Sequence, residues 1–174
     1  LVVEARDAVG GCASTVDALG ARVNVCNCDH SMIRATPIAE ELGLAAHGLA
    51  YIDVDPAQLS LGWDGSTPWF LFRDAGRTLD GLRLAHPREV DGYRRYLAAA
   101  RPVAELVLEV TAAGASPRAV LRAVADRRGR GVATLLAWSR RSVGEVVRSF
   151  FATDALRAPV VTTGPAVWGL SPDT

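Results

Sequence analysis

The feature that most limits what this chain can fold into lies at its start, where a short β-branched run ends in an acid and leads to two adjacent glycines. Leu1 to Glu4 are typical of a buried strand, and a turn follows that reaches Gly10-Gly11. An acid at the end of a buried parallel strand lies at the carboxyl edge of its sheet, where nucleotides bind. Its carboxylate can accept hydrogen bonds from both ribose hydroxyls, and paired glycines let backbone N–H groups approach a diphosphate. The segment therefore predicts part of a dinucleotide-binding unit.

The spacing within this segment resembles a known family signature. Arg6 follows Glu4 by two residues, and Gly10-Gly11 stand ahead of the Ser14-Thr15 pair. This arrangement is similar to the strand-acid-x-Arg-x-x-x-Gly-Gly pattern of the FAD-dependent amine oxidase and phytoene desaturase superfamily. The later segments, including His86-Pro87, resemble most its phytoene dehydrogenase-related branch. The alternative interpretation is a strand and a Gly-Gly turn with an incidental acid.

The resemblance implies an FAD-dependent oxidoreductase that transfers hydride from a C–C or C–N bond of a lipophilic substrate to flavin N5. It also implies peripheral contact with a membrane. It indicates no catalytic residue, because the flavin supplies the chemistry. The residues that it implies as contacts of the cofactor are Glu4, Arg6, Gly10, Gly11, Cys12 and Thr15.

The chain departs from the family pattern in three ways. No G-x-G-x-x-G turn precedes Glu4, the family's C-terminal motif is absent, and Cys12 stands where many relatives have Arg. The chain also opens without Met, inside an apolar run. We therefore expect an internal fragment, either an excised or incomplete piece of a longer chain or a split subunit whose remainder is a second chain. One alternative is a non-catalytic partner or scaffold subunit that has lost FAD. An NAD-dependent dehydrogenase fits less well, because Gly-Gly after the acid belongs to the FAD pattern.

Hydrophobic periodicity and turn residues predict a β-rich first part and a helical remainder. Hairpins are expected over residues 13–25 and over residues 58–72, where Asp64-Gly65 form the turn. Tyr51 to Asp55 alternate as a strand would, and Thr36-Pro37 has the composition of a helix start. The other expected helices cover residues 78–84, 86–110 with a kink or new start at Pro102, 118–126 after Ser116-Pro117, 131–138, 142–151, and a short one capped by Asp154.

The predicted fold class is α/β, in the α+β sense. It combines a partial FAD-binding Rossmann-like unit of the glutathione reductase type with a β-hairpin and a mostly helical segment of a substrate domain. The predicted domains are a partial FAD-binding domain over residues 1–50 and a partial substrate-binding domain over residues 51–174.

Charge and cysteine content limit the partners and the compartment. Nineteen bases, all of them arginine, balance nineteen acids, so no net field would attract nucleic acid, and we expect no such partner. No stretch approaches the ~20 apolar residues of a membrane span, and the start lacks the pattern of a signal peptide. The chain has three cysteines, an odd number, which predicts reduced thiols in a cytoplasmic protein.

Cys26-x-Cys28-x-His30 suggests a metal site, since alternate residues of a strand share one face. Structural zinc sites usually have four ligands and wider cysteine spacing, so we predict no metal and interpret the cysteines as small buried thiols. His30 is interpreted as a loop residue beside the cofactor, and His86 as part of a helix start. No G-x-S-x-G elbow supports a hydrolase. Aromatic side chains are expected in the core, some of them lining an apolar tunnel: Trp63, Trp69, Phe70, Phe72, Trp138, Phe150, Phe151 and Trp168.

Overall fold

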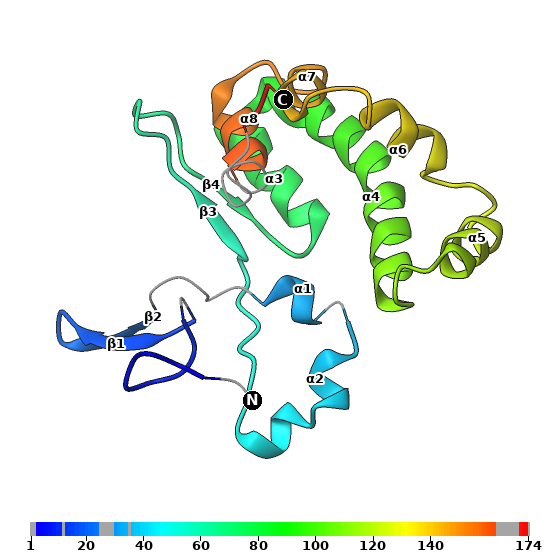
Figure 1. Cartoon of the computed structure of the whole chain (residues 1–174). Coiled ribbons are helices and arrows are strands. Elements are labelled where there is room, and N and C mark those ends of the chain that lie inside the picture. The colour runs from blue at the N-terminus through cyan, green and yellow to red at the C-terminus, as the bar shows by residue number, and fades with distance from the viewer. Residues whose placement is uncertain (1–2, 12, 25–29, 35, 163–170, 174) are drawn as a thin grey trace. The chain divides into compact units, whose positions relative to one another are not determined.

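The fold is taken from a computed structural model of the whole chain, and the structure describes residues 3–11, 13–24, 30–34, 36–162 and 171–173. The chain divides into two compact units, Leu1–Leu49 and Ala50–Thr174. Figure 1 shows the elements of both units, and each unit is described by itself. The predicted identity of these units, an FAD-binding part and a substrate-binding part, stays a prediction.

The first unit is built around one hairpin. Strands β1 (Thr15–Ala18) and β2 (Ala21–Asn24) pair antiparallel, which confirms the hairpin expected over residues 13–25. Leu19 and Gly20 both have positive φ, as a two-residue hairpin turn requires. Short helical segments follow, namely α1 (Ser31–Arg34), α2 (Ile38–Glu41) and a 3-10 helix over Leu44–His47.

Two expected features of the first unit are wrong in the structure. Val3 and Glu4, the described part of the predicted strand Leu1 to Glu4, are exposed and form no strand. The described strands pair only as two antiparallel hairpins, so this run has no parallel neighbour that would bury it. The Thr36 hydroxyl does not cap α2, because it donates to the Ile33 carbonyl one turn earlier.

The second unit begins with another antiparallel hairpin. Strands β3 (Gln58–Ser60) and β4 (Trp69–Leu71) pair with Leu59 opposite Phe70, which confirms the second expected hairpin in a shorter form. The strand expected over Tyr51 to Asp55 is wrong, because none of these residues belongs to a strand in the structure.

Helices make up the rest of the second unit. Their bounds are α3 (Ala75–Ala85), α4 (Val90–Ala112), α5 (Pro117–Asp126), α6 (Val132–Trp138), α7 (Val143–Arg148) and α8 (Asp154–Val161), with a 3-10 turn over Pro87–Glu89 before α4. Asp74, Ser116 and Ser142 cap α3, α5 and α7 through their side chains. Thr153, rather than Asp154, is the N-cap of α8.

Helix α4 continues through Pro102, so no new helix starts there. Val103 and Leu106, on the next turn, are both buried. Because tertiary packing of this kind supplies most helix stability in proteins, it can offset the backbone hydrogen bond that proline removes.

The core of the second unit joins the hairpin to α3, α4, α7 and α8 (Figure 1). Its buried members are Trp69, Leu82, Val90, Tyr93, Val147, Phe151 and Leu156. Around it, Tyr96 stacks on Trp138 and makes an edge contact with Phe150. The core positions predicted for Trp69 and Phe151 are confirmed. Those predicted for Trp63 and Phe70 are wrong, because both side chains are exposed, and Trp168 lies outside the described residues.

Two contacts fix the end of α7 and the start of α8 against the start of α4. The Glu89 carboxylate, only 2% exposed, accepts hydrogen bonds from the backbone N–H of Ala152 at 3.1 Å and of Thr153 at 2.6 Å. Gly92 packs directly against the Phe150 carbonyl, and a Cβ at this position would overlap the carbonyl oxygen. The turn from α7 into α8 therefore depends on the buried Glu89 carboxylate and on glycine at position 92, which has no side chain.

Candidate functional site

The predicted cofactor residues form an ordered turn in the first unit. The Glu4 carboxylate accepts a hydrogen bond of 3.0 Å from the backbone N–H of Arg6, and its Oε1 lies 3.6 Å from Arg6 Nε. Further along, the Ala13 N–H donates to the Gly10 carbonyl at 2.8 Å and closes the turn. Thr15 begins β1 opposite Asn24, while Cys12 lies outside the described residues.

The glycines in this turn are required by its geometry. Gly10 has a φ of 120° and Gly11 one of 56°, both in the region that favours glycine. A Cβ on Gly10 would lie 2.9 Å from the Ala13 carbonyl oxygen. A Cβ on Gly11 would lie 3.8 Å from Arg6 Nη2, so the guanidinium lies beside the turn.

The turn combines one carboxylate, two glycines with positive φ and one guanidinium. Glu4 and Arg6 contact each other, and the Arg6 guanidinium lies beside Gly11. Glu4 does not stand at the end of a strand, and its contact with a cofactor stays a prediction.

The candidate metal ligands do not form a site in the described part of the chain, where no group of three His, Cys, Asp or Glu side chains could hold a metal ion. Cys26 and Cys28 lie outside the described residues. His86 Nε2 lies 2.7 Å from the Thr67 carbonyl oxygen, so its side chain joins the loop between β3 and β4 to the end of α3. The sequence could not show this contact, because its partner is 19 residues away.

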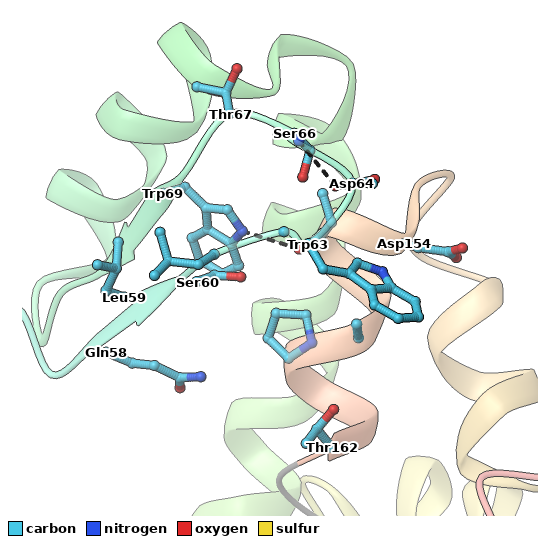
Figure 2. Close-up of a pocket in the computed structure, with 15 residues that line it drawn as sticks. Gln58, Leu59, Ser60, Trp63, Asp64, Ser66, Thr67, Trp69, Asp154 and Thr162 are labelled. Carbon is cyan, nitrogen blue, oxygen red and sulfur yellow. Dashed lines mark hydrogen bonds between the residues drawn. The ribbon is translucent and has the colours of Figure 1, made fainter.

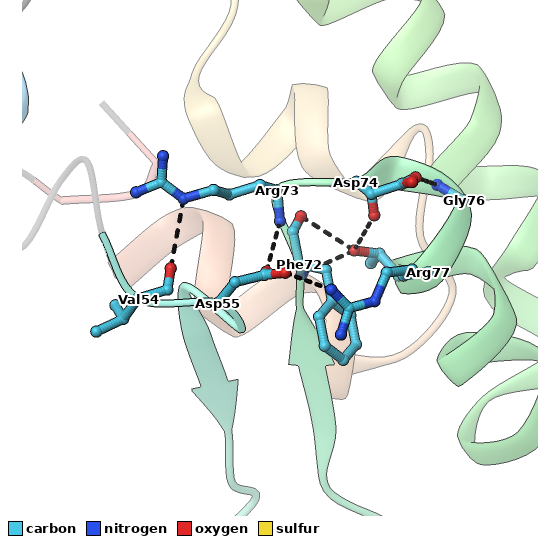
Figure 3. Close-up of polar contacts among 8 residues, drawn as sticks. Val54, Asp55, Phe72, Arg73, Asp74, Gly76 and Arg77 are labelled. Carbon is cyan, nitrogen blue, oxygen red and sulfur yellow. Dashed lines mark hydrogen bonds and ion pairs between the residues drawn. The ribbon is translucent and has the colours of Figure 1, made fainter. Parts of the chain in front are cut away.

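Polar contacts from Arg73 and Arg77 hold residues 53–55, which precede β3 (Figure 3). The Arg73 N–H donates to the Asp55 carboxylate at 3.2 Å, and its guanidinium reaches Asp53 at 2.7 Å and the Val54 carbonyl at 3.3 Å. Arg77 pairs with Asp55 and lies over the Phe72 ring, 4.1 Å from its centroid. Side chains thus replace the strand pairing that the alternating sequence had indicated.

The second unit contains a cavity of about 290 Å³ between the β3–β4 hairpin and α8 (Figure 2). Two indoles and small side chains of α8 form much of its wall. The lining residues are Gln58, Leu59, Ser60, Leu61, Gly62, Trp63, Asp64, Ser66, Thr67, Trp69, Asp154, Ala155, Ala158, Pro159 and Thr162. The sequence did not point to this cavity, because its two walls are far apart in the chain.

Two hydrogen bonds shape the cavity. Trp69 Nε1 donates to the Ala155 carbonyl at 3.1 Å and joins the hairpin to α8. The Asp64 carboxylate accepts the Ser66 N–H at 3.0 Å, and hydrogen bonds from the Ser66 backbone and hydroxyl lower the pKa of Asp64. Asp64 is therefore ionised at neutral pH, and the hairpin loop is held by its own polar groups.

Among the described residues, no helix is both long and apolar enough to cross a lipid bilayer.

The chain is similar to part of a known dehydrogenase. It is 34% identical over 94 residues to a subunit of limonene dehydrogenase from Castellaniella defragrans, and the match covers 54% of this chain. The same match spans only 17% of the length of that relative. No model of a known protein family matches the chain, and no solved structure matches it. The comparison supports the expectation of an oxidoreductase at the level of a dehydrogenase subunit.

Proposed function

We propose that the chain is part of an FAD-dependent dehydrogenase subunit of the phytoene desaturase type. The observation that carries the proposal is the 34% identity to a dehydrogenase subunit, together with the turn that groups Glu4, Arg6, Gly10 and Gly11. The relative is named for limonene, a hydrocarbon, which agrees with a lipophilic substrate. We also propose that the protein is cytoplasmic and makes peripheral contact with a membrane.

The role of this chain in the reaction is to hold and orient the cofactor. Bound FAD would supply the hydride acceptor. The Glu4 carboxylate would accept hydrogen bonds from the ribose hydroxyls, and the Gly10-Gly11 backbone would admit the diphosphate without a steric clash. Arg6, beside the same turn, would balance part of the diphosphate charge.

The first test is replacement of Glu4 by alanine in the purified enzyme that contains this chain. Loss of hydrogen bonds to a charged acceptor should weaken FAD affinity about 10- to 100-fold, as measured by titration of the flavin-free protein with FAD. Glu41→Ala removes an exposed acid on α2 and serves as the matched control, with unchanged affinity. Equal FAD affinity in the Glu4 variant and the control would refute the role of Glu4.

A partner subunit that has lost FAD is the second candidate. The relative is named as one subunit of its dehydrogenase, which agrees with an enzyme of several subunits. Flavin content distinguishes the two candidates, because a partner subunit would support activity of the complex while the chain's own subunit retains no FAD.

A further inference from the structure

Strand β3 (Gln58–Ser60) forms an open edge of the sheet in the second unit. Among the described strands it pairs only with β4, while α3 packs against β4 (Figure 1). Gln58 and Leu59 are exposed, and Ser60 is partly buried. Because N–H groups along an antiparallel strand point alternately to its two edges, part of the β3 backbone faces outward from the hairpin.

The sequence of this edge does not protect it from pairing. Natural proteins protect open edges with charged side chains or prolines. Residues 57–63 contain neither a charged residue nor a proline. In this segment Leu59 is 44% exposed, Leu61 is 69% exposed, and Trp63 is fully exposed. An uncharged edge with exposed apolar side chains favours the addition of another strand, and a two-stranded hairpin gains stability from one.

The chemistry of the edge defines the strand that fits it. An added strand would bond to β3 through main-chain N–H and carbonyl groups, and its side chains would lie beside those of Leu59 and Leu61. A charged side chain at these positions would lose water without gaining an opposite charge, since residues 57–63 offer none. The fitting strand is therefore uncharged and apolar where it faces the two leucines.

The shortness of β3 favours a strand from the same polypeptide over a separate molecule. The strand has 3 residues, so its edge is roughly 10 Å long. Stable interfaces between separate proteins bury about 1,200–2,000 Å², far more than so short an edge provides. A covalently linked strand needs less, because its effective concentration is high. The match to the dehydrogenase subunit spans only 17% of that relative, so most of the relative lies outside the matched segment.

We propose that a third strand, uncharged and apolar toward Leu59 and Leu61, pairs with the open edge of β3, and that it comes from the remaining part of the dehydrogenase subunit. The origin of the strand rests on the proposed function. The pairing itself rests on the exposed, unprotected edge alone.

The test is hydrogen exchange in the native protein that contains this chain, resolved to single amides by mass spectrometry with electron-transfer fragmentation. With strands on both sides of β3, the consecutive amides of Gln58, Leu59 and Ser60 should all exchange at least about 100-fold more slowly than unstructured amides. With β4 as the sole neighbour, slow and fast amides should alternate along β3. The alternating pattern would overturn the proposal.

Two variants of matched exposure show whether the protection comes from an added strand. Leu61→Glu places a charge beside the edge and should speed exchange of the outward β3 amides at least about tenfold. Leu121→Glu, on α5, replaces a leucine that is 71% exposed, compared with 69% for Leu61, and should leave β3 unchanged. Equal exchange in the two variants would overturn the proposal.

Protein concentration and flavin content separate the remaining outcomes. Protection of β3 should persist at dilutions where sedimentation shows a monomer. Protection that is lost on dilution would assign the edge to a second copy of the chain and overturn the proposal. Concentration-independent protection in a protein without flavin would refute the proposed function and leave the edge pairing standing.

Discussion

Replacing Glu89 with alanine is expected to destabilise the second unit by roughly 3 kcal/mol, because two backbone N–H groups lose a charged acceptor. The carboxylate also lies at the start of α8, where negative charge stabilises the helix. Urea unfolding followed by tryptophan fluorescence measures the effect, since Trp63, Trp69 and Trp138 all belong to this unit.

Two further variants show whether the loss of stability comes from the buried carboxylate. Glu89→Gln keeps one acceptor and should lose only part of the stability. Asp91→Ala removes an acid whose side chain is 88% exposed, and should change the stability by less than about 0.5 kcal/mol. A Glu89→Ala variant as stable as Asp91→Ala would show that the buried carboxylate does not hold the α7–α8 reversal.

Replacing Gly92 with alanine should destabilise the second unit by about 2–3 kcal/mol, through overpacking against a backbone atom. The new Cβ would overlap the Phe150 carbonyl oxygen, which cannot rotate away as a side chain could. Either α4 must move from the end of α7 or the backbone at Phe150 must shift. The same fluorescence-detected unfolding measures the loss.

Gly81 offers a matched control for this prediction. It also lies inside a helix, α3, but a Cβ there would meet no atom within 4 Å. Gly81→Ala should therefore stabilise the unit by about 0.5–1 kcal/mol, because alanine loses less backbone entropy on folding. Equal effects at the two positions would contradict the close approach of α4 to Phe150.

Features set by neighbouring residues could be predicted from the sequence. The hairpin at Leu19-Gly20 follows from turn chemistry, and the start of α5 at Ser116-Pro117 follows from a cap and a proline. Both depend on residues within a few positions of each other. The confirmed core tryptophan, Trp69, follows from the default burial of large apolar side chains.

Features that need distant partners could not be predicted in this way. Tyr51 to Asp55 alternate like a strand, but the structure assigns no strand to them, and Arg73 binds Asp53, Val54 and Asp55. Glu89 has nothing in its local sequence that indicates a cap 63 residues away. The cavity beside Trp69 likewise arises only when the hairpin meets α8. For the candidate cofactor turn, the contacts between Glu4 and Arg6 and between Arg6 and Gly11 are local, but the predicted strand that would end at Glu4 is wrong and FAD binding stays a prediction.

The most direct test of the proposed function is the visible absorption spectrum of the native protein that contains this chain, purified without added cofactor. A flavin-binding dehydrogenase subunit should show the two bands of oxidised flavin and should release FAD on denaturation. The bands should bleach when the lipophilic substrate is added without oxygen. A folded, active protein with neither flavin absorbance nor released FAD would contradict the account.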